Sequence, residues 1–132
     1  YSANLDAQML ALDKLFERLH AAAMDTGLFP LAGIRSRAHC CDHFRVGDGS
    51  PGYAFVHLLV KLGAGRTEQE QAVAAKAFFD TLSLHLQPLY DQQGLAISFE
   101  MTELPVTLKF NKNNLRDYMT EAHDGAEKEN RS

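Results

Sequence analysis

Alternate residues between positions 34 and 46 carry many of the side chains in this chain that could do chemistry. The odd positions of this run are Arg35, Arg37, His39, Cys41, His43 and Arg45. Alternate side chains of a β-strand lie on the same face, so the pattern predicts a strand with one cationic and one mostly apolar face. Arginines on such a face have a chemistry of their own, because a guanidinium can bind an anion through two hydrogen bonds and stays charged. Arg37 could equally pair with an acid across a subunit contact.

Three other side chains on the same predicted face are of the types that bind zinc. His39, Cys41 and His43 at alternate positions could surround a zinc ion, but the sequence offers no fourth ligand at a recognised spacing. We therefore prefer to interpret them as ordinary strand residues at a subunit contact, and predict no metal site.

Arg66 ends the loop Gly63-Ala64-Gly65 immediately before a predicted helix. Free amides at a helix N-terminus favour an anion, so Arg66 is another candidate anion ligand. Its ordinary interpretation is a solvated surface arginine. His57 lies in the middle of an apolar strand, and a hydrogen-bonded histidine of the core or of an interface is preferred there to a catalytic one.

Apolar periodicity predicts the elements that position these residues. A first helix covers residues 5–23, with Asp6 as N-cap and Gly27 after its end. Strands are expected at 34–46, 53–62 and 95–101, the first two joined as a hairpin by a turn at 47–52. A second helix begins at a capping box, Thr67 and Glu70. Its predicted buried face consists of Ala72, Ala75, Phe79, Leu82, Leu86 and Leu89.

The order of these elements predicts an α+β fold. The strands at 53–62 and 95–101 flank a helix, so they should be parallel neighbours joined by a right-handed crossover. The first half shows helix and strand without a leading strand. Residues 1–119 are expected to form a single domain with a short helical turn near Leu115, Tyr118 and Met119, and the polar residues 120–132 a flexible tail.

Composition excludes several classes of protein. The chain has 132 residues, 45% of them apolar and 23% charged, as in one soluble globular domain. The net charge of −4 argues against a broad nucleic-acid surface, and no apolar run reaches the ~18 residues of a membrane span. The only cysteines, Cys40 and Cys41, are adjacent. A disulfide between neighbours is strained, so we expect two free thiols and a cytoplasmic protein.

Several ordered blocks of the sequence resemble the 5-carboxymethyl-2-hydroxymuconate Δ-isomerase family. They read TGLFPLAGIRSRAH (residues 26–39), YAFVH (53–57), KLGAGR (61–66), LAISFE (95–100) and TLKFNKNN (107–114). The resemblance is specific over these blocks and weak over residues 1–23.

The resemblance implies a fold and a reaction. The fold is that of the tautomerase superfamily: two layers built from two βαβ halves, with the helices on one face of a mixed sheet. The subunits form a homotrimer with active sites near subunit contacts. The reaction converts a 2-hydroxymuconate dienol with three carboxylates to its 2-oxo-enoate isomer, in homoprotocatechuate and 4-hydroxyphenylacetate degradation, without metal or organic cofactor. Arg35 and Arg66 match the family's arginines, and Arg37 could assist them in binding the substrate.

The sequence departs from the family at its start. The family's general acid/base is an amino-terminal proline, whereas this chain begins at Tyr1 and its first proline is Pro30. A strand of about 5–6 residues that begins with proline would supply both the base and the missing leading strand, so we expect that the sequence is shortened. Two alternatives remain: a non-catalytic member of the fold that binds a dicarboxylate or only oligomerises, and a small metal-binding module that uses His39, Cys41 and His43.

Overall fold

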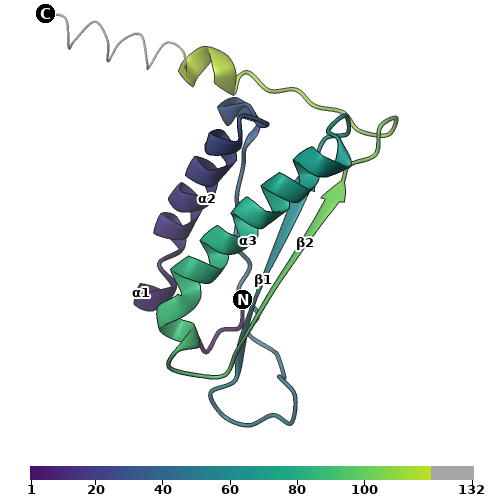
Figure 1. Ribbon diagram of the computed structural model, residues 1–132. Coiled ribbons are helices and arrows are strands. Elements are labelled where there is room, and N and C mark those ends of the chain that lie inside the picture. The colour runs from purple at the N-terminus through teal and green to yellow at the C-terminus, as the bar shows by residue number, and fades with distance from the viewer. Residues whose placement is uncertain (120–132) are drawn as a thin grey trace, which may run out of the picture.

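The structure is a computed structural model that describes residues 1–119 (Figure 1). Its elements, in order, are α1 (Ala7–Leu10), α2 (Leu12–Thr26), the 3-10 turn η1 (Leu31–Gly33), β1 (Ala54–Leu62), α3 (Glu68–Tyr90) and β2 (Leu95–Glu103). Residues 115–119 add the expected helical turn. The tail predicted at 120–132 lies outside the described residues. No helix in the described part is long and apolar enough to cross a membrane.

The molecule has two layers, with α2 and α3 side by side over one face of the sheet (Figure 1). β1 and β2 are parallel and in register from Ala54 opposite Leu95 to Leu62 opposite Glu103. Within residues 1–119 the sheet consists of this parallel pair. The predicted α+β class and βαβ unit are confirmed. So is the capping box at the start of α3, where the Thr67 hydroxyl accepts from the Glu70 amide.

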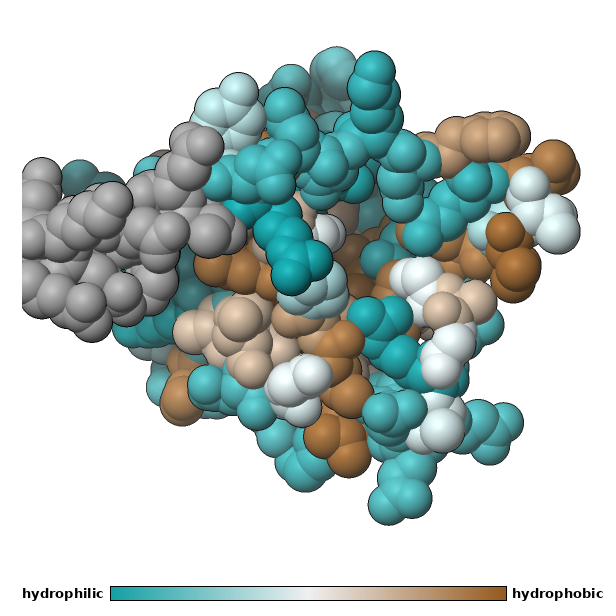
Figure 2. Space-filling view, turned by 90° about the horizontal axis from the view of Figure 1, so that it is seen from above, coloured by the Kyte–Doolittle hydropathy of each residue, from teal (hydrophilic) through white to brown (hydrophobic). Residues whose placement is uncertain are grey.

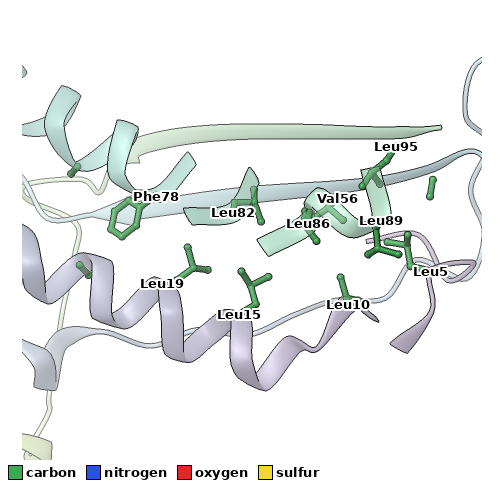
Figure 3. Packing of buried hydrophobic residues seen from close by; sticks show 13 residues of the cluster. Leu5, Leu10, Leu15, Leu19, Val56, Phe78, Leu82, Leu86, Leu89 and Leu95 are labelled. Atoms are coloured by element: carbon green, nitrogen blue, oxygen red, sulfur yellow. The ribbon is translucent and has the colours of Figure 1, made fainter. Parts of the chain in front are cut away.

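The core lies between the two helices and the sheet (Figure 3). Leu15 and Leu19 of α2 point toward Phe78 and Leu82 of α3. The predicted buried face of α3 is correct at Leu82, Leu86 and Leu89 and wrong at its beginning, where Ala74 and Phe78 are buried in place of Ala72, Ala75 and Phe79. The face that meets α2 is one residue out of phase with the expected one, and Phe79 instead contacts Phe99 of β2.

The expected first helix is interrupted at Ala11. This residue has a left-handed backbone with φ 43° and separates α1 from α2, while Asp6 caps α1 and Gly27 ends α2 as predicted. His85 of α3, only 7% exposed, makes a 2.7 Å hydrogen bond from Nε2 to the carbonyl of Leu10. Arg18 donates to its Nδ1 over 2.9 Å. This arrangement requires a neutral imidazole with its proton on Nε2, and it satisfies a carbonyl next to the break in the helix.

The predicted strand at 34–46 and its hairpin with 53–62 are wrong. Residues 34–46 form no regular strand, and the isolated bridge between Ser2 and Cys41 is parallel. Residues 1–3 lie between this segment and β1: the Cys41 amide donates to the Tyr1 carbonyl (2.7 Å), and the Ser2 amide donates to the Phe55 carbonyl (3.1 Å). The chain start therefore occupies the position beside β1 that the hairpin would have required.

Candidate active site

Arg35 opens onto a cavity at one end of the molecule. The cavity has a volume of about 310 Å³ and is lined by Gly33, Arg35, Phe110, Asn111, Lys112 and Asn113. The turn η1 ends two residues before Arg35, and the Gly33 amide closes this turn onto the Pro30 carbonyl. Arg35 is exposed, so its guanidinium is accessible to a ligand.

The opposite wall of the cavity comes from residues 104–114, which we call the strap. The strap leaves β2 with a 2.8 Å hydrogen bond from the Leu104 amide to the Leu62 carbonyl. It then brings the ammonium of Lys109 beside Gly63 and reaches η1, where the Asn113 amide group donates to the Ala32 carbonyl over 2.8 Å. Figure 2 looks onto the upper end of the molecule, where polar and apolar side chains lie open side by side.

Arg66 holds two loops together. Its Nε and Nη2 donate to the Leu28 carbonyl (3.2 and 2.8 Å), and Nη1 donates to the Gly63 carbonyl (3.0 Å). The guanidinium carbon lies 4.4 Å from the centre of the Phe29 ring, a cation–π contact. Three of the five N–H groups are thus used internally, and the other two have no partner within residues 1–119.

Arg35 and Arg66 occupy different positions relative to the cavity. Arg66 fixes the segment that leads from α2 into η1, and Arg35 follows η1. Arg35 lines the cavity of 310 Å³, and Arg66 does not. The cavity lining contains no carboxylate and no histidine, so it supplies positive charge and amide donors rather than a base.

Comparison with known proteins decides the family. The model of the 5-carboxymethyl-2-hydroxymuconate isomerase family matches residues 1–119. A 5-carboxymethyl-2-hydroxymuconate Delta-isomerase of Escherichia coli is 41% identical over 104 residues, which cover 79% of this chain and 82% of that protein. The chain belongs to the 5-carboxymethyl-2-hydroxymuconate isomerase family. The prediction of this family, and with it of an isomerase, is confirmed.

Solved structures agree with this assignment. The crystal structure of a 5-carboxymethyl-2-hydroxymuconate isomerase from Deinococcus radiodurans R1 matches with a TM-score of 0.82 and 29% identity, over 89% of this chain and 88% of that one. A 5-carboxymethyl-2-hydroxymuconate delta-isomerase matches with a TM-score of 0.74 and 21% identity, over 89% and 84%. The second, at this low identity, supports the fold alone. The fold is that of the tautomerase superfamily, as predicted.

The remaining candidate residues of this family member lie apart from the cavity. Arg37 is exposed and has no hydrogen bond or ion pair within residues 1–119. His39, Cys41 and His43 do not converge, and no group of three metal-ligating side chains forms among the described residues. The alternative of a metal-binding module therefore lacks the geometry that it needs.

His57 is hydrogen-bonded, as expected, but it lies on the open face of the sheet rather than in the core. Its Nδ1 is 2.7 Å from the Ser98 hydroxyl, and its Nε2 is 3.1 Å from a Glu100 carboxylate oxygen. These residues are cross-strand neighbours of β1 and β2.

Two shifted pKa values occur in the described residues, one of the exposed Asp48 and one of the half-buried Tyr1, and both groups lie away from the cavity. Hydrogen bonds from Ser50 lower the pKa of the Asp48 carboxyl. The side-chain hydrogen bond with Cys40 is the main cause that raises the pKa of the Tyr1 phenol. Neither group lines the cavity beside Arg35, so neither is placed to move a proton there.

Proposed function

We propose that this protein converts 5-carboxymethyl-2-hydroxymuconate, a dienol with three carboxylates, to its 2-oxo-enoate tautomer, in homoprotocatechuate and 4-hydroxyphenylacetate degradation. The observation that carries the proposal is the cavity beside Arg35, which offers cationic and amide donors and no acid. A polycarboxylate fits such a lining because charge-assisted hydrogen bonds to carboxylates are strong. The likeness to the Escherichia coli isomerase supports the same reaction.

Each arginine has a role that its geometry permits. Arg35 binds a carboxylate of the substrate with its exposed guanidinium. Arg66 does not line the cavity but holds the loop that leads into η1 and Arg35. We assign to it the stabilisation of the negative charge that grows on the 2-oxygen as the proton moves, because a fixed cation near that oxygen lowers the barrier. Arg37 is a weaker candidate, since within residues 1–119 it neither lines the cavity nor, unlike Arg66, donates a hydrogen bond to the loop that leads into η1.

A base must complete the site, and we assign this role to an amino-terminal proline in a strand before Tyr1. Ser2 pairs with Cys41 in parallel, and Arg35 precedes Cys41 by six positions. In a continued parallel register the sixth residue before Ser2 would therefore pair with Arg35. A secondary amine beside a cation is held partly neutral near pH 7, so it can accept a proton.

The test compares the 132-residue chain with a version that carries additional residues before Tyr1. The extension adds a strand-forming segment of five residues before Tyr1, so that its first residue, a proline, lies at the sixth position before Ser2. With the extended version, we expect the ultraviolet absorbance of the dienol to disappear about 100-fold or more faster than with the 132-residue chain. The matched control begins with alanine instead of proline. Equal rates for the two extended versions would contradict the proline base. Ligand binding without turnover by either would support the non-catalytic alternative.

We further propose that the active protein is a cytoplasmic homotrimer. The strap presents three alternate apolar side chains to solvent in the single chain: Val106, Leu108 and Phe110 are 80%, 81% and 92% exposed. Exposed apolar side chains grouped in this way are typical of a surface that another subunit covers in the assembly. The thiols of Cys40 and Cys41 are free, which is usual in a reducing compartment.

The assembly is tested by placing a charge on the strap. Leu108→Asp should convert the trimer to smaller species, because a buried carboxylate at a subunit contact is unfavourable. Light scattering after size-exclusion chromatography measures the mass. The control is Leu84→Asp, at an equally exposed leucine (77%) on α3. A trimer that survives Leu108→Asp, or that Leu84→Asp disrupts equally, would contradict the role of the strap.

A further inference from the structure

A second cation lines the cavity beside Arg35. Lys112 of the strap lies in this lining between Asn111 and Asn113. We propose that Lys112 is a carboxylate-binding residue that, together with Arg35, takes one carboxylate of a polycarboxylate substrate and favours substrates with three carboxylates over those with two. This inference rests on the proposed function, since it names what the same cavity selects.

The position of Lys112 is fixed by its neighbour. The Asn113 side chain donates to the Ala32 carbonyl (2.8 Å) and accepts from the Leu115 amide (2.9 Å). The first of these hydrogen bonds attaches the strap to η1 one residue after Lys112 and close to Arg35, and the second fixes the Asn113 side chain locally. The attachment of Asn113 to η1 therefore holds the neighbouring Lys112 at the cavity beside Arg35.

The charges of the cavity are unbalanced. None of the ion pairs among residues 1–119 involves Arg35 or Lys112, and the lining has no acidic side chain. Two cations that share a cavity repel each other, and an anion between them turns this repulsion into attraction. A carboxylate can accept from both cations and from the asparagine amides, since it offers about four lone-pair sites.

The two cations differ in what they contribute. The fork of Arg35 binds a carboxylate in a fixed orientation, whereas Lys112 is a point charge on a flexible stem. We therefore expect Lys112 to add affinity for the charge without setting the position of the reacting atoms. Its loss should raise KM and leave kcat within about twofold, which is the signature of binding that is equal in the ground and transition states.

Equilibrium binding tests the role of Lys112 in the 132-residue chain and does not depend on turnover. The probes are propane-1,2,3-tricarboxylate and the dicarboxylate glutarate, measured by isothermal titration calorimetry. Lys112→Gln should lower the affinity for the tricarboxylate about tenfold and the affinity for glutarate less than threefold. Lys112→Arg should restore the affinity. The matched control is Lys76→Gln, at an exposed lysine of α3 that pairs with Asp80.

Each result has a definite meaning. An effect of Lys112→Gln no larger than that of Lys76→Gln, an equal loss for both probes, or no binding of either probe by the unaltered protein would overturn the inference. A selective loss in tricarboxylate binding supports it, even if the proline-extended version proves unable to isomerise the dienol. In that case the proposed function fails and the polycarboxylate site stands.

Discussion

Replacing Arg35 by glutamine is expected to lower kcat/KM for the dienol by about two to three orders of magnitude. Glutamine keeps the approximate length of the side chain and removes both the charge and the fork that a carboxylate needs. Arg35 is exposed and makes no hydrogen bond or ion pair within residues 1–119, so the free energy of unfolding should stay within about 0.5 kcal/mol of its original value. Kinetics of the proline-extended version, together with urea unfolding, measure both quantities.

Arg35→Lys separates charge from geometry. It keeps the positive charge but loses the planar fork, so its kcat/KM should lie between those of the unaltered protein and Arg35→Gln. Lys76→Gln controls for the loss of a surface charge outside the cavity, and its kcat/KM should equal that of the unaltered protein. A kcat/KM of Arg35→Gln within threefold of that of the unaltered protein would remove Arg35 from the site.

The parts of the fold that sequence predicts well are those that depend on local interactions. The capping box at Thr67 and Glu70, the cap at Asp6 and the αL residue Gly27 are each determined by a few neighbouring residues, and all three are present. The parallel pair of β1 and β2 was also predictable, because a strand, a helix and a second strand leave one favourable connection.

The failures come from long-range contacts. Alternation over 34–46 predicts a strand, but a strand needs a partner in register, and residues 1–3 take the position beside β1. Periodicity also gave no sign of the break at Ala11, since the apolar spacing continues across it. The carbonyl of Leu10 beside this break accepts from His85, which is 75 residues away along the chain. A histidine within an apolar helical face is the signal that could have suggested such a partner.

The candidate site was found only in part. Arg35 and Arg66 were named through the family resemblance, and composition alone would have left Arg66 as a surface residue. The strap and Lys112 were missed, because the polar run from 111 to 114 has no periodicity that indicates where it packs. Only the hydrogen bond from Asn113 to Ala32 brings that run to Arg35.

Arg66→Ala is expected to lower both stability and activity. The substitution leaves the carbonyls of Leu28 and Gly63 without their donor and removes the contact with Phe29. Hydrogen bonds from a charged donor contribute about 1.5–3 kcal/mol, so the free energy of unfolding should fall by about 2–3 kcal/mol. Under the proposed role of Arg66 at the 2-oxygen, loss of its charge should lower kcat/KM about 100-fold or more.

Because Arg66 supports the loop that leads to Arg35, the fall in activity needs a control for misplacement of that loop. Gln71→Ala provides it: Gln71 donates to the backbone carbonyl of Arg66 and to Glu103, so its loss disturbs the same junction and leaves the guanidinium in place. If Arg66 acts on the substrate, Arg66→Ala loses far more activity than Gln71→Ala does for a given loss of stability. If both variants lose the same activity for a given loss of stability, Arg66 only holds the loops together. Another group must then stabilise the developing negative charge.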